Sequence, residues 1–170
     1  MSQQKRRQWM QSAGLAGASF WIGGSAAQAA NDKLNIAVIG VGGRGAANLN
    51  GVRGENIVAL CDVDDKRAGS AYSQFPKAKK FYDYRRMLDK MHGSIDAVVI
   101  STPDHTHYHP SMAAMELKKH LHLEKPMAHN VMEARKLTEA ARAAGIVSQM
   151  GIQGRSDEGI RLVNEWINDG

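Results

Sequence analysis

A regular alternation of apolar runs and helical patterns, from residue 34 to the end of the chain, most constrains the fold. The apolar runs are short and nearly continuous, which is typical of strands buried on both faces of a parallel sheet. Helical periodicity fills the stretches between them, and the connections are short. The sequence therefore predicts a doubly wound α/β sheet of strand order 3-2-1-4-5-6. We expect its strands at residues 34–39, 57–61, 80–82, 95–100, 120–123 and 146–150.

Helices are expected between these strands, and polar residues mark several of their ends. Asp64 and Asn130 precede helical patterns and are good N-caps, and Gly145 follows the end of one helix. In doubly wound sheets, ligands bind beyond the carboxyl ends of the strands. The residues that directly follow each strand are therefore the first candidates for a functional site. The expected helices are 44–52, 64–74, 84–91, 107–118, 131–144 and 156–168.

The first thirty residues have the composition of a targeting segment. Three basic residues at 5–7 precede an Ala- and Gly-rich stretch at 13–27, and residues 27–29 are small at the spacing that signal peptidase requires. The apolar stretch is too short and too rich in glycine for a stable membrane span. We therefore predict a signal peptide over residues 1–30, with cleavage near Ala29 and no stable membrane insertion afterwards.

An arginine pair in this segment predicts the export route. Arg6 and Arg7 are followed by Trp9 and Met10, which stand where twin-arginine signals have a Phe and a Leu. The alternative is an ordinary secretory signal in which two arginines are adjacent by chance. The twin-arginine route carries folded proteins, which suits a protein that binds its cofactor in the cytoplasm. We expect the twin-arginine export machinery as a partner and a periplasmic or otherwise exported location.

The basic character of the chain comes largely from this leader. The net charge is +5, and residues 1–30 contribute three Lys or Arg and no acid. The positive charge is thus poor support for nucleic-acid binding, and we expect no nucleic-acid partner. The single cysteine, Cys61, excludes an internal disulfide framework and a cysteine-based zinc site. Its place in an apolar run indicates a small buried side chain.

A glycine-rich segment after the first strand carries a functional signal, because residues 40–45 match the pattern G-x-G-x-x-G. It follows a strong predicted strand and opens a predicted helix, which is the context of a dinucleotide-binding loop. Gly40 permits a tight turn, Gly42 lets the backbone approach a pyrophosphate, and Gly45 lets the helix pack closely on the strand. The amides and dipole at the helix N-terminus then favour an anion. The predicted cofactor-binding residues here are Gly40, Gly42, Gly43, Arg44 and Gly45.

Asp62 ends the second strand, 22 residues after Gly40. A carboxylate at this place accepts hydrogen bonds from an adenosine ribose, and it repels a 2′-phosphate, so NAD is predicted over NADP. Lys66 and Arg67 soften that preference, because either could approach a phosphate. The alternative is a glycine-rich turn that binds no nucleotide, with an aspartate that only caps a helix.

Three alternating histidines, His105, His107 and His109, follow the fourth predicted strand and suggest a metal site. Alternate residues on extended backbone share a face without converging, and no His-x-x-x-His helical pair accompanies them. We therefore predict no metal. The preferred interpretation is a polar loop that lines the cofactor cleft, with Thr102 and Pro103 among its contacts.

The fifth predicted strand ends in Glu124, Lys125 and Pro126. Because this strand is also parallel and buried, its end should face the same cleft. A lysine there could donate a proton or hydrogen-bond a substrate oxygen. Glu124 is a candidate partner that holds Lys125, and Pro126 turns the chain away. The alternative is a surface ion pair in a loop.

Together these motifs resemble the glucose–fructose oxidoreductase / inositol dehydrogenase (Gfo/Idh/MocA) family. The resemblance covers residues 32–170 and rests on the segments 37–45, 61–64, 101–128 and 141–151. The Glu-Lys-Pro element, placed after a Thr-Pro-x-x-x-His loop, is much more specific than the glycine pattern. The fold expected from the resemblance is the same as that predicted from the strand and helix pattern.

The resemblance also implies roles for particular residues. Lys125 is expected beside the nicotinamide and the substrate, where it takes part in catalysis, and the bond to Pro126 is expected to be cis. His107 corresponds to the loop histidine near the nicotinamide end. Glu124 and Gln153 join the expected cofactor contacts, although many family members have an Asn where this chain has Gln153.

The resemblance further implies a second, mostly β domain that carries most substrate contacts and completes the catalytic set. The 170 residues contain the motif-bearing half. We therefore expect residues 31–155 to form the dinucleotide-binding Rossmann domain and residues 156–170 to begin the connection to the second domain. Family members associate through the second domain, so a homo-oligomer is expected for the full-length protein.

Three functions remain open at this point. The first is an exported oxidoreductase that transfers a hydride between NAD and a hydroxyl of a small sugar or polyol. The second is a glycoside hydrolase of the same family that uses bound NAD for transient oxidation. The third is a truncated nucleotide-binding remnant without catalysis. The first two share the nucleotide-binding domain, so its motifs do not separate them.

Overall fold

A computed structural model describes residues 33–155 and 158–170 of the chain. The predicted signal peptide, residues 1–30, lies outside the described residues. The described part contains a six-stranded sheet in the order β3-β2-β1-β4-β5-β6, and every neighbouring pair is parallel. This confirms the predicted doubly wound sheet. The strands are β1 (Asn35–Ile39), β2 (Asn56–Cys61), β3 (Lys79–Phe81), β4 (Ala97–Ile100), β5 (His120–Leu123) and β6 (Ser148–Met150).

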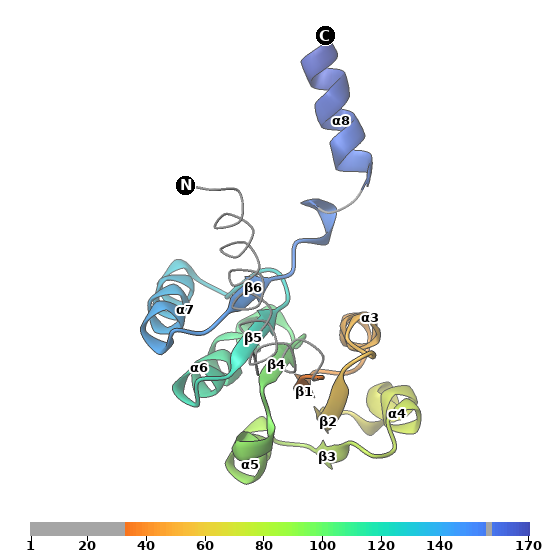
Figure 1. The fold of residues 1–170 in the computed structure, drawn as a ribbon, viewed down its shortest axis with the longest axis vertical. Helices are drawn as coiled ribbons and strands as arrows, with labels where there is room; N and C mark the ends of the chain where they lie inside the picture. The colour runs from red at the N-terminus through yellow and green to blue at the C-terminus, as the bar shows by residue number, and fades with distance from the viewer. Residues whose placement is uncertain (1–32, 156–157) are drawn as a thin grey trace, which may run out of the picture. The chain divides into compact units, whose positions relative to one another are not determined.

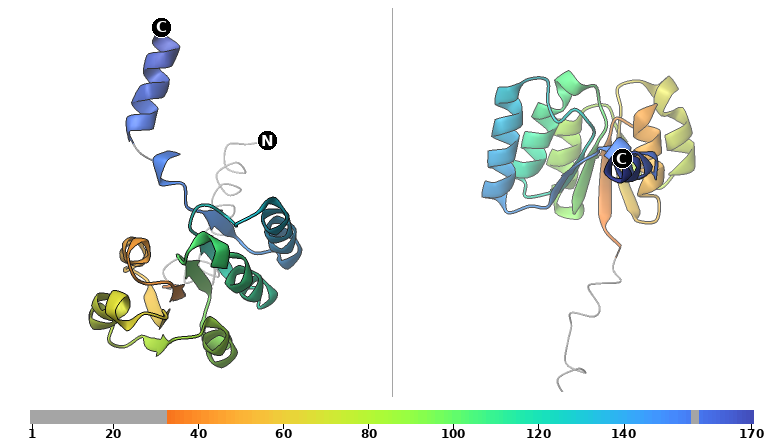
Figure 2. Two further views of the ribbon diagram at one scale, coloured as in Figure 1. Left: turned by 180° about the vertical axis from the view of Figure 1, so that it is seen from behind. Right: turned by 90° about the horizontal axis from the view of Figure 1, so that it is seen from above.

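Helices cover both faces of the sheet (Figures 1 and 2). One face packs against α3 and α4, and the other packs against α5, α6 and α7. The helices are α3 (Arg44–Gly51), α4 (Asp65–Gln74), α5 (Tyr84–Met91), α6 (Tyr108–Glu116), α7 (Val131–Ala144) and α8 (Glu158–Asp169), with short 3₁₀ turns η1 (His92–Ser94), η2 (Asp104–Thr106) and η3 (Gln153–Arg155).

The central strand β1 shows how one strand serves two hydrophobic clusters. Ile36 and Val38 join the cluster under α3 and α4, whereas Ala37 and Ile39 join the cluster under the other three helices. All four are buried, since successive side chains of a strand point to opposite faces. Each fully buried Val or Ile side chain contributes about 1.5–3 kcal/mol to the stability of the fold. The nearly continuous apolar run seen in the sequence is thus explained by burial on both sides.

Caps set several helix boundaries as predicted. The Asp64 carboxylate accepts hydrogen bonds from the amides of Lys66 and Arg67 and begins α4. Asn130 caps α7 through the amide of Glu133, and Gly145 ends that helix in the left-handed conformation. These three residues satisfy backbone groups that a helix end leaves unpaired.

Most boundaries differ from prediction by one or two residues, and the clearest differences are in α6 and β6. The helix expected over 107–118 begins at Tyr108 after η2 and ends at Glu116, and Lys118 has a φ of 56°, outside the helical range. The last strand begins at Ser148 instead of Ile146, because the amide of Val147 donates to His120 Nδ1 rather than to a backbone carbonyl. Neither change moves the carboxyl end of a strand.

Candidate nucleotide-binding site

The carboxyl ends of the strands form one aligned edge. The amide of Gly40 donates to the carbonyl of Cys61, and the amide of Asp62 donates to the carbonyl of Phe81. Ser101, Glu124 and Gly151 likewise donate to the last residue of the neighbouring strand, Ile39, Ile100 and Leu123 respectively. The parallel ladder therefore continues one residue past the strands. It brings residues from five distant parts of the sequence to the same edge, as the strand-end rule predicts.

The glycine loop leaves no room for side chains at its two ends. Gly40 has a φ of 80°, and a Cβ there would lie 2.9 Å from backbone atoms of Ser101 and Thr102. A Cβ on Gly45 would lie 1.9 Å from the Gly40 carbonyl oxygen, because α3 begins directly against the loop. Both roles agree with the sequence prediction. At Gly42, the contact of an added Cβ is instead the Arg67 side chain at 2.9 Å.

The Asp62 carboxylate anchors the glycine loop. Its Oδ2 accepts hydrogen bonds from the amides of Val41 at 2.8 Å and Gly42 at 3.3 Å. Its Oδ1 accepts from the amide of Asp64 at 3.0 Å. Asp62 therefore ties the glycine loop to the end of the second strand. This role is separate from the ribose contact, which stays a prediction. Sequence reasoning did not foresee this second role.

A cavity of about 640 Å³ opens beside this loop. Of the predicted cofactor residues, Gly40, Gly42, Gly43, Arg44, Asp62, Thr102 and Pro103 line it. Cys61 also lies in its wall, but burial, together with the nearby carboxylates of Asp62 and Asp83, raises the pKa of its thiol to about 12. That thiol stays protonated at neutral pH, so it does not act as a nucleophile.

Several lining residues were not predicted from the sequence. Val63 is 85% exposed beside Asp62. Arg67, in contrast, was expected near a phosphate, and it lines the cavity from α4. Tyr82 and Tyr84 enter it from the end of β3, and the Tyr82 hydroxyl donates to Asp65 at 2.8 Å. The predicted strand order was a usable signal, since it places β3 next to β2. Residues that follow β3 are thereby brought beside Asp62.

The residues of this cavity fit a dinucleotide. The amides of Gly43 and Arg44, at the start of α3, donate to no acceptor within residues 33–155 and 158–170. They line the cavity at a helix N-terminus, where the dipole favours an anion such as a pyrophosphate. The buried Thr102 hydroxyl also has no partner in the described part of the chain. A bound anion would satisfy the two amides, whereas the Thr102 hydroxyl is buried behind the cavity wall.

The Glu-Lys-Pro turn differs from prediction in one respect. Lys125 is exposed and its bond to Pro126 is cis, as expected, but among the described residues Glu124 forms its ion pair with Arg44 and not with the Lys125 ammonium. The Glu124 side chain turns inward, and its Oε2 accepts a hydrogen bond of 2.7 Å from the backbone amide of Lys125. The correction follows from burial, because an inward carboxylate needs donors that lie inside the protein.

His107 is also placed differently from the prediction. It is 1% exposed and does not line the cavity, whereas His105 and His109 are exposed. Its Nδ1 lies 2.7 Å from the Pro126 carbonyl oxygen, and its Nε2 lies 2.7 Å from the Thr102 carbonyl oxygen. His107 therefore joins the loop after β4 to the turn after β5. Both ring nitrogens are thus placed against protein carbonyls, and the cofactor contact of His107 stays a prediction.

Gln153, the remaining predicted contact, belongs to the same buried group. Its side-chain amide donates to Glu124 Oε1, and the residue does not line the cavity. Asn48 of α3 joins it with a bond of 3.4 Å to the same oxygen. Burial, the largest influence, raises the pKa of Glu124, but hydrogen bonds from Arg44, the Lys125 amide, Asn48 and Gln153 together lower it to about 2. The carboxylate is therefore charged at neutral pH.

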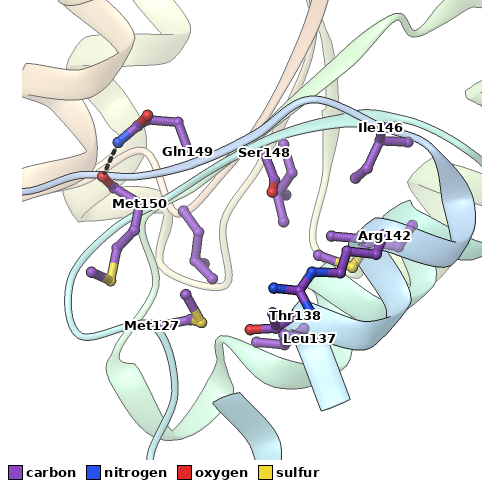
Figure 3. A pocket seen from close by; sticks show the side chains of 12 residues that line it. Met127, Leu137, Thr138, Arg142, Ile146, Ser148, Gln149 and Met150 are labelled. Carbon is purple, nitrogen blue, oxygen red and sulfur yellow. Dashed lines mark hydrogen bonds between the residues drawn. The ribbon is translucent and has the colours of Figure 1, made fainter. Parts of the chain in front are cut away.

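A second cavity, of about 270 Å³, lies against β5, β6 and α7 and shares no lining residue with the first. Figure 3 shows that its labelled side chains come from α7, from β6, from the segment between them and from the turn after β5. Leu137 and Met127 supply an apolar wall, and Arg142 lies at the rim. It carries neither a glycine loop nor a carboxylate beside one. The first cavity is therefore the candidate nucleotide site.

The described residues contain neither a candidate metal site nor a candidate membrane-spanning helix. Within residues 33–155 and 158–170, no three His, Cys, Asp or Glu side chains come together in a way that could hold a metal ion. Among the helices of the same residues, none has both the length and the apolar character needed to cross a membrane.

The sheet order, the glycine loop and Asp62 define a dinucleotide-binding domain of the Rossmann type. Residues 34–152 match the family model described as "Oxidoreductase family, NAD-binding Rossmann fold" (GFO_IDH_MocA). The chain belongs to this family, which confirms the resemblance seen in the sequence.

Individual relatives agree with this assignment. An inositol 2-dehydrogenase of Rubrobacter xylanophilus is 32% identical over 145 residues, which are 82% of this chain and 41% of the relative. A glycosyl hydrolase family 109 protein of Solibacter usitatus is 31% identical, over 66% of this chain and 28% of the relative. The structure of an NAD binding oxidoreductase from Klebsiella pneumoniae is 29% identical with a TM-score of 0.66, over 81% of this chain and 39% of that one. The chain thus spans less than half the length of these proteins.

Proposed function

We propose that the chain is the NAD-binding part of an oxidoreductase that acts on a hydroxyl group of a small sugar or polyol. The observation that carries the proposal is the open cavity between the anchored carboxylate of Asp62 and two amides at the α3 N-terminus, which donate to no acceptor in the described part of the chain. Family membership supports the cofactor, and the inositol 2-dehydrogenase similarity supports a polyol-like substrate.

The residues of the cavity would divide the work of holding NAD. The amides of Gly43 and Arg44 would hold the pyrophosphate, because they point their partial positive charge into the cavity. Asp62 would accept hydrogen bonds from the adenosine ribose and repel a 2′-phosphate, which favours NAD over NADP. Arg67 lines the same cavity and would weaken that preference if it turned toward the ribose.

The reaction follows from the cofactor and from Lys125. Bound NAD supplies the acceptor for a hydride that leaves the substrate carbon as its C–H bond breaks. The ammonium of Lys125 would hold the substrate oxygen by a hydrogen bond and favour transfer of the hydroxyl proton to a base of the second domain that the family resemblance implies. His107 and Glu124 would fix the backbone of the turn that carries Lys125, through the Pro126 carbonyl and the Lys125 amide.

The test of this proposal uses the gene in its complete reading frame. The purified protein is incubated with NAD and a panel of inositols, sugars and sugar acids, and NADH formation is followed by fluorescence. We expect NADH to form with at least one polyol or sugar and to depend on Lys125. If no substrate of this kind yields NADH and NAD does not bind, the proposal is wrong.

An NAD-dependent glycoside hydrolase is the second candidate, and the similarity to a glycosyl hydrolase family 109 protein favours it. Transient oxidation followed by elimination returns the hydride, so no net NADH is expected. The assay uses aryl glycosides with NAD present. Release of the aryl group without NADH accumulation favours the hydrolase, whereas NADH accumulation on free sugars favours the dehydrogenase.

We also propose that the protein leaves the cytoplasm by the twin-arginine route. The support is Arg6 and Arg7 followed by Trp9 and Met10 in a leader of signal-peptide composition. In the test, both arginines are replaced by lysine, which keeps the charge but removes the pair. We expect the variant to remain in the cytoplasm, and undiminished export would support an ordinary secretory signal.

A further inference from the structure

Glu124 is a buried carboxylate with an unusual number of donors. The residue is 4% exposed and lies directly after β5. Its Oε1 accepts hydrogen bonds from Arg44 Nε at 2.8 Å, from Asn48 at 3.4 Å and from the Gln153 side chain. Its Oε2 accepts the backbone amide of Lys125 at 2.7 Å. Both oxygens are therefore used, one by other segments and one by the turn itself.

These donors come from segments that are distant in the sequence. Arg44 and Asn48 belong to the first two turns of α3, which follow the glycine loop, and Gln153 belongs to η3 after β6. Arg44 also lines the nucleotide cavity, with its side chain 49% exposed. Glu124 does not line that cavity. The carboxylate is thus joined by one hydrogen bond to Arg44, which lines the nucleotide cavity, and by another to the Lys125 amide.

We propose that Glu124 is a positioning residue, which together with Arg44 fixes the Lys125–Pro126 turn to the start of α3. The Lys125 side chain then keeps a constant distance from a nucleotide that the glycine loop holds. The inference rests on the proposed function, because the role of Lys125 comes from there. It assigns to Glu124 no contact with the cofactor and no proton transfer.

The charge of Glu124 is what the arrangement requires. Oε1 faces three donors and Oε2 faces one, so each oxygen must act as an acceptor. In Glu124→Gln, one side-chain orientation turns the amide NH₂ toward Arg44, Asn48 and Gln153, and the other turns it toward the Lys125 amide. Either orientation breaks one side of the connection. The same change in a fully exposed ion pair would alter the stability little. Here the carboxylate side of the pair is buried, so a lost hydrogen bond is not replaced by water.

The first experiment needs no cofactor. The purified 170-residue chain is labelled with ¹⁵N, and exchange of the Lys125 amide with solvent deuterium is measured by NMR in the wild type and in Glu124→Gln. We expect this amide to exchange about tenfold faster in the variant, the factor for loss of one hydrogen bond of ordinary strength. Glu116→Gln is the matched control, because Glu116 is exposed at the end of α6, and it should leave the exchange rate unchanged.

The second experiment separates positioning from simple support of the fold. The Lys125 amine is acetylated with and without NAD, and modification is read by peptide mass spectrometry, while NAD affinity is measured by calorimetry. In the wild type we expect NAD to slow acetylation of Lys125, because the family resemblance places the nicotinamide beside this side chain. In Glu124→Gln we expect NAD affinity within about threefold of the wild type but most of the protection lost. A residue that only stabilises the fold would not separate these two readouts.

A second pair of variants keeps the test decisive if Glu124→Gln fails to fold. Arg44→Met removes the ion-pair partner from a side chain that is half exposed, and we expect faster exchange of the Lys125 amide. Arg44→Lys retains a cation and should recover part of the slow exchange. Unchanged amide exchange in both Glu124→Gln and Arg44→Met overturns the proposal, as does equal loss of NAD affinity and of protection in Glu124→Gln. A wild type that binds no NAD overturns the proposed function instead, and the amide exchange result still stands.

Discussion

Two regions of the strand-end edge handle polar groups in opposite ways. On the loop side, at the ends of β1 and β2, backbone amides and glycines border an open cavity. On the lysine side, at the ends of β4 and β5, His107 and Glu124 are buried, and their polar atoms contact other parts of the protein. The loop side therefore presents backbone amides and the Asp62 carboxylate to an open cavity, whereas on the lysine side buried side chains hold the turn that carries Lys125.

Closing the loop side should have the largest effect. In Gly45→Val, the new Cβ would lie 1.9 Å from the Gly40 carbonyl oxygen, so α3 must move away from the loop. We expect NAD affinity to fall by about a hundredfold or more and the free energy of unfolding to fall by about 3 kcal/mol. Calorimetry with NAD and urea unfolding measure the two effects.

Gly51→Ala is the matched control in the same helix. A Cβ at Gly51 meets no atom within 4 Å, and the position has a helical backbone. We expect unchanged NAD affinity and a gain of about 0.5–1 kcal/mol in the free energy of unfolding. A similar loss of NAD affinity in both variants would contradict a specific role of the loop.

On the lysine side, Lys125→Ala should act on turnover. In the complete protein, we expect turnover to fall by about a hundredfold, the lower range for a group that assists proton transfer. Affinity for NAD should change little, because Lys125 does not line the nucleotide cavity. Steady-state kinetics and NAD calorimetry on the same preparation check this. Undiminished turnover would remove Lys125 from the mechanism.

Removing the buried histidine should weaken the fold instead of the binding. His107→Leu removes the ring that lies 2.7 Å from both carbonyl oxygens, of Thr102 and Pro126, and leaves at least one of them without its donor. We expect a loss of about 1–3 kcal/mol in the free energy of unfolding. His109→Leu, at an exposed position on α6, should change it by less than about 0.5 kcal/mol. Equal urea midpoints for the two variants would show that the buried contacts contribute little.

Asp62→Ala tests whether the carboxylate recognises the ribose or only anchors the loop. Its loss frees the amides of Val41, Gly42 and Asp64, which weakens binding of any dinucleotide. The ribose contact adds a loss specific to NAD, so we expect about a tenfold loss for NAD and a smaller one for NADP. Equal losses in parallel calorimetric titrations would leave Asp62 only the anchoring role.

A pH dependence from Glu124 is expected only in acid, so it is the smallest of these effects near neutral pH. Its pKa in the folded protein is about 2, below the ordinary value of 4.5, so its stabilising contribution is complete above the higher value. That contribution is lost as the pH falls from about 5 toward 2, because the folded state must then accept a proton at a lower pKa than the unfolded state. Urea midpoints over this range should fall less steeply in Glu124→Gln. Equal slopes would show that Glu124 does not titrate as described.

The sequence was sufficient for the fold and for most of the loop side. Strand burial, the glycine spacing and the place of Asp62 are local properties, so periodicity and motif spacing predict them. The strand-end rule then brought Gly40, Asp62, Thr102 and Lys125 to one edge. It did not tell which of these line the cavity, because that depends on the direction of each side chain.

The lysine side was harder to predict because its partners are distant in the sequence. Glu124 is 80 residues from Arg44, and the contact forms only once β5 and α3 are placed beside the same strand end. His107 was expected at the cofactor for its position in the loop, but the start of α6 turns its ring inward. A polar residue next to a cleft was assumed to face it. Here two of them face the interior.

NMR of the ¹⁵N-labelled chain can test whether NAD binds on the loop side, beside residues 40–45 and Asp62. On titration with NAD, we predict that the amide signals of residues 40–45 and 62–64 shift together and saturate. Those around the second cavity, at Leu137 and Arg142, should stay in place. Absence of shifts at the glycine loop, or saturable shifts confined to the second cavity, would contradict the account.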